Sequence, residues 1–268
     1  MPTDASFLKR YRDLAPSIGI KPNSVVETIL AHRSVRAFTP EPVSEDALKQ
    51  IVAAAQSAAT SSNLQAWSVI AVSDEARKER LAILCDDQKF IKQAPLFLVW
   101  CADLSRARRV AAYDLEGADY LEAFLLAVID ATLAAQNAAI AAESLGLGIC
   151  YVGALRDHPE DVGKELNFPP NVFGVFGMSI GHPDPAKPAA VRPRLPQAVV
   201  LHFDGYDTGK EKEAVDSFNK IQREFQTEQG MKLSDWTERV ADRLKSKDSL
   251  YGRHVLREAI NALGFKLR

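Results

Sequence analysis

The longest helical pattern in the chain covers residues 115–145, and it most constrains how the chain can fold. No strong helix breaker follows Gly117, and alanines fill much of the segment. About thirty residues rising about 1.5 Å each would span about 45 Å. A helix that is apolar on several sides needs neighbours on several sides, so we expect a core spine or a subunit interface. The apolar positions, with one threonine among them, are Leu121, Leu125, Val128, Thr132, Leu133 and Ile140.

The most apolar part of this segment, residues 121–140, also has the length of a membrane helix, which needs roughly twenty residues. Polar or charged side chains interrupt it at Glu122, Asp130, Gln136 and Asn137. Such side chains are costly inside a bilayer. The pattern therefore favours a buried helix of a soluble protein, with no membrane partner.

Composition narrows the possible functions. The chain has 268 residues, 47% of them hydrophobic and 25% charged, which is enough for one large domain or two small ones. Its formal net charge of -2 argues against nucleic-acid binding, so local basic clusters would serve small anions. Cys85, Cys101 and Cys150 are far apart, which favours buried thiols and a cytoplasmic location over disulfides or zinc. Residues 1–11 contain no apolar run, so we expect no secretory signal.

Short apolar runs alternate with amphipathic segments along the rest of the chain, which predicts an α+β or α/β layered fold. We expect strands at residues 67–72, 96–101, 149–152, 172–180 and 198–203, the first two of them buried. We expect helices at residues 25–31, 44–58, 74–84, 159–166, 212–225, 234–244 and 250–262, the first two capped by Ser24 and Ser44. The predicted organisation is an N-terminal extension (1–23), a core (24–205) and a C-terminal helical extension of the same domain (206–268).

A basic stretch at residues 32–36 joins the first of these helices to an extended segment. His32, Arg33, Ser34 and Arg36 place three potential cations and a hydroxyl in five positions. One interpretation is a solvated helix end whose cations complement the helix dipole. The other interpretation is a phosphate-binding cluster.

Two further polar segments stand out. Residues 60–65 offer five hydrogen-bonding side chains in six positions, immediately before the strand expected at 67–72, and could be simply a polar loop. Arg192 and Arg194 flank a proline in a proline-rich segment, so two guanidinium groups sit on a stiffened backbone.

Together these segments resemble the flavin-dependent nitroreductase family. The matching motifs are His32-Arg33-Ser34-Val35-Arg36, Asn63-Leu64-Gln65 and Arg192-Pro193-Arg194-Leu195-Pro196. Residues 136–148, followed by Tyr151-Val152-Gly153, are similar to the NADPH-dependent flavin reductases and oxygen-insensitive nitroreductases. The resemblance covers residues 25–203. It implies a mixed four- or five-stranded sheet flanked by helices, a long central helix, and an intertwined homodimer that binds one FMN per subunit non-covalently.

The resemblance also implies roles for individual residues. His32, Ser34, Arg192 and Arg194 match positions that hold the FMN phosphate, and Arg33 belongs to the same cofactor-binding set. Arg36 would face the pyrimidine edge of the flavin and stabilise its reduced form. A Gly153 N–H would approach flavin N5, which only a small residue would allow. The other expected cofactor contacts are Thr60, Ser61, Ser62, Asn63, Gln65, Gln88, Tyr151, Val152 and Ala154.

By the same resemblance, the flavin takes hydride from NADPH or NADH and passes it to a nitroaromatic, a quinone or free flavin in a ping-pong sequence. No side chain is then expected to act as a catalytic acid or base, and no metal is expected. The chain contains no zinc-protease, α/β-hydrolase or P-loop motif. Two alternatives stay open: a flavin-binding redox sensor without catalysis, and a related dehalogenase or ene-reductase.

The residues expected to contact the nicotinamide nucleotide or the substrate are Arg156, Arg223 and Lys232. Residues 223–232 match a mobile loop that is rich in arginine in members preferring NADPH. Here that segment has only two cations and two glutamates. The choice between NADPH and NADH therefore stays open.

Overall fold

The computed structural model describes residues 4–268, which form two compact units. The sheet unit comprises Ser34–Pro188 and Tyr251–Arg268, and the helical unit comprises residues 4–33 and Ala189–Leu250. The first three residues of the predicted N-terminal extension lie outside the described residues. The organisation into segments 1–23, 24–205 and 206–268 stays a prediction.

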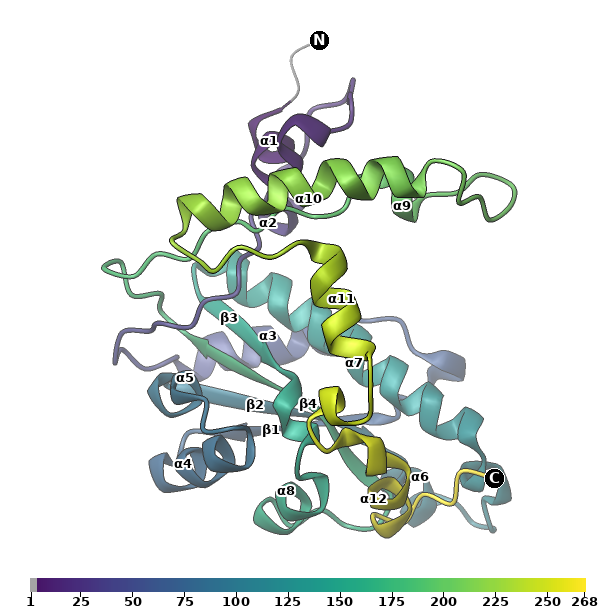
Figure 1. Ribbon diagram of the computed structural model, residues 1–268. Helices are drawn as coiled ribbons and strands as arrows, with labels where there is room; N and C mark the ends of the chain where they lie inside the picture. The colour runs from purple at the N-terminus through teal and green to yellow at the C-terminus, as the bar shows by residue number, and fades with distance from the viewer. Residues whose placement is uncertain (1–3) are drawn as a thin grey trace. The chain divides into compact units, whose positions relative to one another are not determined.

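A four-stranded sheet forms the centre of the sheet unit (Figure 1). Its three pairings are antiparallel, and one isolated parallel bridge joins Ser34 to Ile149. The prediction of an α+β fold with four or five strands is confirmed, and the only parallel pairing recorded among the described residues is that bridge. In their order across the sheet, the strands are β1 (Trp67–Val72), β2 (Leu96–Asp103), β4 (Val172–Gly181) and β3 (Gly148–Val152).

The central strand β2 is buried along its whole length, as expected for a strand covered on both faces. Its alternate side chains enter two different hydrophobic clusters. Leu98 and Trp100 pack with residues of two helices, α3 (Glu45–Gln56) and α7 (Leu121–Ser144). Phe97 and Val99 pack on the other face, with residues of α4 (Glu75–Leu84) and α8 (Pro159–Glu165). The edge strand β1 is mostly half-buried, so the prediction of a buried strand there is wrong.

The prediction of a strand at residues 198–203 is also wrong. Residues Gln197–Val200 form a short helix, α9, and the following residues form no strand. Val200 and Phe203 are 66% and 81% exposed. A strand needs a neighbour to satisfy its backbone, and these residues pair with no strand of the sheet unit.

The long helix α7 packs one alanine-rich face against the sheet (Figure 1). It has 24 residues and spans about 36 Å, shorter than expected. The cause is a separate 3₁₀ turn, Glu116–Asp119, before an extended Tyr120. Across residues 4–268, α7 alone has the length and apolarity of a membrane helix, and 44% of its most apolar window is buried. Leu121, Leu125, Ile129 and Leu133 remain exposed on its outer face.

Most of the expected helices are present with changed ends, but the one expected at 250–262 begins only at Leu256, and the short helices at Lys89–Gln93 and Ser105–Val110 were not expected. Ser44 caps α3 as expected, but Asn23 rather than Ser24 caps α2, because its side chain accepts from the Val26 N–H. An N-terminal helix that sequence patterning did not predict precedes it. The further helices of the sheet unit are α5 (Lys89–Gln93), α6 (Ser105–Val110) and α12 (Leu256–Ala262). Those of the helical unit are α1 (Ala5–Tyr11), α2 (Ser24–Leu30), α9, α10 (Glu211–Glu228) and α11 (Trp236–Leu244).

Replacing Gly177 with alanine should destabilise the protein. A Cβ at this position on β4 would lie 2.1 Å from Cζ of Phe97, whose ring is fully buried and cannot move aside. Overpacking of this kind costs about 1–3 kcal/mol. Gly117→Ala is the matched control, since nothing lies within 4 Å of its Cβ. Urea unfolding of both variants would measure the difference, and equal stabilities would contradict the packing described here.

Candidate functional site

The basic stretch runs alongside strand β3. Ser34 forms the parallel bridge with Ile149, and the Val35 N–H donates to the Ile149 carbonyl at 2.8 Å. Val35 is buried, whereas Ser34 and Arg36 are exposed. Pairing with a strand thus turns the two polar side chains outward on either side of an apolar anchor.

The Arg36 guanidinium lies 5.8 Å from the centre of the Phe90 ring, a cation–π contact. Phe90 belongs to α5, and Gln88 is the N-cap residue of that helix. Burial raises the pKa of the Cys150 thiol on β3, and the charge of Arg36 acts in the opposite direction. The structure therefore brings three sequence-predicted segments together: the basic stretch, the Gln88 segment and β3. Sequence reasoning missed Phe90, because a single aromatic residue outside any motif carries no functional signal.

The end of β3 carries Tyr151, Val152, Gly153 and Ala154 as a continuous segment leading into a 3₁₀ turn. Val152 and Ala154 are buried in a hydrophobic cluster of the sheet unit. The Tyr151 hydroxyl donates to Gln136 Oε1 at 3.4 Å, and its ring meets the Phe176 ring edge to face. Burial raises the pKa of Tyr151. Contacts at both its hydroxyl and its ring thus fix the position of Tyr151.

Two guanidinium groups lie beside Gly153. A Cβ at Gly153 would be 3.5 Å from Arg156 Nη2 and 3.9 Å from Arg253 Nη1. These are ordinary contacts, so the chain's own packing does not require glycine there. Arg156 Nη1 donates to the Val175 carbonyl, and Arg253 Nε donates to Asp157 at 2.5 Å. Arg253 was missed, because it lies about a hundred residues from this strand in the sequence.

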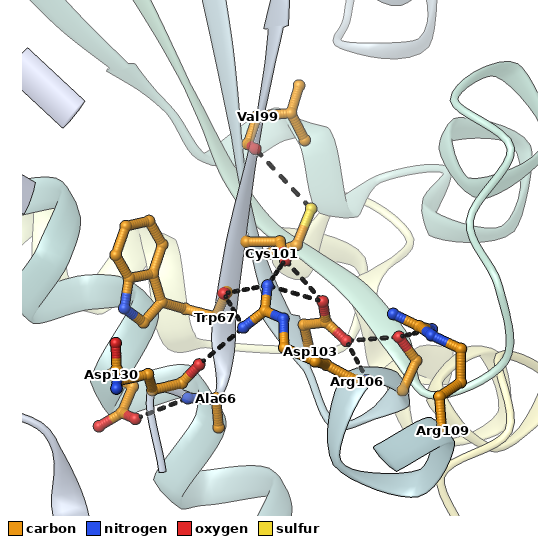
Figure 2. Close-up of polar contacts among 11 residues, drawn as sticks. Ala66, Trp67, Val99, Cys101, Asp103, Arg106, Arg109 and Asp130 are labelled. Atoms are coloured by element: carbon orange, nitrogen blue, oxygen red, sulfur yellow. Dashed lines mark hydrogen bonds and ion pairs between the residues drawn. The ribbon is translucent and has the colours of Figure 1, made fainter. Parts of the chain in front are cut away.

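The polar loop at residues 60–65 has an unusual backbone. Ser62, Asn63 and Gln65 have φ values of 48°, 54° and 49°, the left-handed region that L-residues seldom adopt. The side chains from Ser61 to Gln65 are exposed, and Thr60 is half-buried. Strained, exposed backbone of this kind concentrates at binding sites. Two residues outside the loop, Asp130 and Arg106, hold its ends (Figure 2).

In the helical unit, Arg10 connects the two cationic segments. This residue of α1 is only 5% exposed. Its guanidinium donates to the carbonyls of Leu30 at 2.7 Å, His32 at 2.6 Å and Arg192 at 2.7 Å, and the Arg10 carbonyl accepts from the Arg194 N–H at 3.2 Å. Sequence reasoning missed Arg10, because a basic residue near the N-terminus gives no sign of burial.

The predicted cations of the helical unit differ in their partners. Arg192 stacks on Phe225 at 5.7 Å from the ring centre, and Arg194 Nη1 donates to the Arg192 carbonyl at 3.2 Å. Arg223 forms two hydrogen bonds to Asp235, at 2.5 and 2.6 Å, and lies on α10 rather than in a loop. Lys232 is exposed between α10 and α11.

Arg33 lines an open hollow of about 610 Å³ in the helical unit. Lys9 and Arg12 line the same hollow, and Arg12 forms a two-bond ion pair with Glu228 at 2.7 and 2.6 Å. Leu8, Val191 and Phe225 contribute apolar surface. Arg33 therefore shares its surroundings with one carboxylate and two other cations.

The chain matches the models of a known protein family and is similar to named relatives and to solved structures. The model of the nitroreductase family matches residues 29–182, and that of the nitroreductase family C-terminal domain matches residues 192–268. FMN reductase (NADPH) of Bacillus subtilis is 36% identical over 244 residues, 88% of this chain and 97% of the relative. FMN reductase [NAD(P)H] of the same organism is 37% identical over 253 residues, 91% of this chain and 99% of the relative. The solved structure of the NADPH:FMN oxidoreductase of Vibrio harveyi complexed with NAD+ has a TM-score of 0.83, with 33% identity, and the match covers 92% of this chain and all of that one.

Replacing Arg10 with methionine should lower the free energy of unfolding by roughly 3 kcal/mol, because three part-buried carbonyls would lose a charged hydrogen-bond donor. Methionine keeps the length of the apolar stem. Lys9→Met, at the exposed neighbouring position on α1, is the matched control and should change stability little. Thermal and denaturant unfolding would measure both, and equal stabilities would show that Arg10 does not connect these segments.

Proposed function

The chain belongs to the nitroreductase family, and we propose that it is an FMN-dependent NAD(P)H oxidoreductase that reduces free flavin, quinones or nitroaromatic compounds. Its relatives of nearly equal length are named FMN reductases, which supports flavin as cofactor and as electron acceptor. When bound, FMN would supply the hydride-transfer chemistry, so the protein needs no side-chain acid or base.

The observation that carries the proposal is the surroundings of Arg36. Its guanidinium rests against the Phe90 ring, and no carboxylate among residues 4–268 forms an ion pair with it. A cation left unneutralised can stabilise the negative charge that reduction places on the pyrimidine edge of a flavin. Gln88, two residues before Phe90, and the end of β3 would contact the same flavin ring.

We assign the remaining cofactor contacts according to the part of FMN that each residue would bind. The exposed loop residues Thr60, Ser61, Ser62, Asn63 and Gln65 would bind the pyrimidine ring and the ribityl chain. A phosphate monoester carries about −1.5 to −2 charges at neutral pH, which calls for several cations. We assign this task to His32, Arg33, Arg192 and Arg194, with the Ser34 hydroxyl, since Arg10 ties the backbones of His32 and Arg192 together.

For the nicotinamide nucleotide we propose Arg156 as the nearest cation, because it lies beside Gly153 at the end of β3. Lys232 is the second candidate. Arg223 contributes less, since its charge is paired with Asp235. With one paired arginine in this segment, we propose that the enzyme accepts both NADPH and NADH.

The first test of the proposal is reduction of the bound cofactor. The purified protein should contain FMN, and anaerobic mixing with NADPH or NADH should bleach its visible flavin absorbance within seconds. Subsequent addition of FMN, a quinone or a nitroaromatic compound should restore the colour. A protein that binds FMN but does not bleach would be a flavin-binding sensor, and a protein without affinity for FMN would refute both functions.

Arg36→Ala should slow anaerobic bleaching by about 10²-fold while changing FMN affinity only slightly, because it removes charge stabilisation of the reduced ring. Arg194→Ala should loosen FMN about tenfold and leave the bleaching rate of the bound flavin nearly unchanged, because it removes a charged hydrogen bond to the phosphate. Stopped-flow absorbance and FMN titration separate the two effects. Arg77→Ala, at a surface pair with Glu165, is the control. Equal effects of the first two variants would refute this division of roles.

We also propose that the protein is a cytoplasmic homodimer. Four exposed apolar side chains follow one another at every fourth position of α7, between 42% and 56% exposed: Leu121, Leu125, Ile129 and Leu133. Exposed apolar side chains aligned on one helix face mark protein interfaces. The three cysteines are free and buried, as suits a reducing compartment, and burial raises the pKa of Cys85 to about 12.

Ile129→Glu should weaken the dimer at least 100-fold, because it buries a charge in the apolar interface. Analytical ultracentrifugation over a range of concentrations would measure the dissociation constant. Ile83→Glu on α4 is a closely matched control, since Ile83 and Ile129 are 58% and 56% exposed. A dimer unaffected by Ile129→Glu would show that this face of α7 is not the interface.

A further inference from the structure

The polar loop needs an external restraint to keep its shape. Three of its residues hold left-handed backbone without the freedom of glycine. Inside the loop itself, two hydrogen bonds involve side chains: the Gln65 N–H donates to Thr60 Oγ1 at 2.9 Å, and Gln65 Nε2 donates to Asn63 Oδ1 at 3.3 Å. Both bonds are exposed to water, where they compete with solvent.

The first external restraint is Asp130, which lies on α7 and is 1% exposed. Its Oδ2 accepts from the Thr60 hydroxyl at 2.6 Å and from the Ala66 N–H at 3.0 Å, and its Oδ1 accepts from the Ser61 N–H at 3.3 Å. One carboxylate thus binds both ends of the loop, as Figure 2 shows for Ala66. Because the Ala66 bond is buried and the other two are part-buried, they restrain the loop more firmly than its exposed side-chain bonds.

The second restraint is Arg106, which approaches the end of the loop from α6. It donates to the Gln65 carbonyl at 3.1 Å, to the Trp67 carbonyl at 3.3 Å and to Ser68 Oγ at 2.7 Å. Asp103 orients it by accepting from the Arg106 backbone N–H at 3.2 Å and facing its guanidinium at 3.7 Å (Figure 2). The loop is therefore held by an acceptor on one side and a donor on the other.

We propose that Asp130 and Arg106 are positioning residues for the cofactor: they hold residues 60–66 in the strained shape that contacts FMN, without touching it. The inference rests on the proposed function. It requires a carboxylate at position 130, because an amide has only one acceptor oxygen and its NH₂ group would face one of the three loop donors.

The test measures how fast FMN leaves the holoprotein, followed by the fluorescence of released flavin. Asp130→Asn should accelerate release about tenfold, and Arg106→Gln about threefold. Asp119→Asn is the matched control: Asp119 is also a buried carboxylate, but it accepts from Arg108 and Lys266 and not from the loop. Release from this control should match the wild type. Release from both Asp130→Asn and Arg106→Gln at the wild-type rate would overturn the proposal.

A double-mutant cycle with Ser62→Gly separates positioning from a general loss of stability. Glycine adopts the left-handed backbone without strain, so the loop would need less restraint. Ser62→Gly should therefore slow FMN release in the Asp130→Asn protein relative to its effect in the wild type. If Asp130→Asn does not fold, the same cycle in the Arg106→Gln background applies, since the Arg106 side chain is half exposed.

The outcomes distinguish the inference from the function on which it rests. If the wild-type protein binds no FMN, the proposed function fails and the positioning role falls with it. If the wild type binds FMN and is reduced by NADPH or NADH, but Ser62→Gly acts equally in both backgrounds, only the positioning role is overturned.

Discussion

The sheet unit depends on the close packing of α7 against the sheet. Ala134, Ala138 and Ala142 are buried in the same cluster as Trp100 and Met178. Small side chains let the helix backbone approach the strands, so that polar side chains on the same helix reach neighbouring backbones. Asn137 Nδ2 donates to the Ala54 carbonyl on α3 at 3.2 Å. Asp130 reaches the polar loop in the same way, and larger residues in place of the alanines would move both polar groups away from their partners.

The helical unit uses a related arrangement. Gln226 on α10 is 1% exposed, and its side-chain amide exchanges hydrogen bonds with the Ser234 N–H and carbonyl at 2.9 and 3.0 Å. Asn219 accepts from the Trp236 N–H at 2.9 Å at the start of α11. In each unit, therefore, polar side chains on the longest helix bind backbone groups of neighbouring segments that those segments do not satisfy themselves. Burying these groups is costly, and the hydrogen bonds to backbone offset that cost.

Patterns in the sequence predicted the features that depend only on neighbouring residues. The strand at residues 67–72 and the cap at Ser44 follow from a short apolar run and from capping chemistry within a few residues. The failures are non-local. Residues 198–203 have a strand-like composition, but whether they pair depends on a neighbour that their sequence does not describe. The family motifs identified the segments around Arg36, whereas Asp130 was noted only as an interruption in an apolar helix. Its partners lie 64 to 70 residues away, so no window of sequence contains the interaction.

For the same reason, resemblance to family motifs finds the residues that contact a cofactor more readily than the residues that hold them in position. When a cofactor carries the reaction, the protein contributes position and electrostatic field, and a field depends on which charges are neutralised. Arg36 and Arg223 are both exposed arginines in the predicted site, yet the partner of Arg36 is the Phe90 ring and that of Arg223 is a carboxylate. An aromatic face orients a guanidinium without cancelling its charge, whereas Asp235 cancels most of it. Residue type alone would rank the two arginines equally, but their partners leave the charge of Arg36 less neutralised, which suits the role proposed for it beside a reduced flavin.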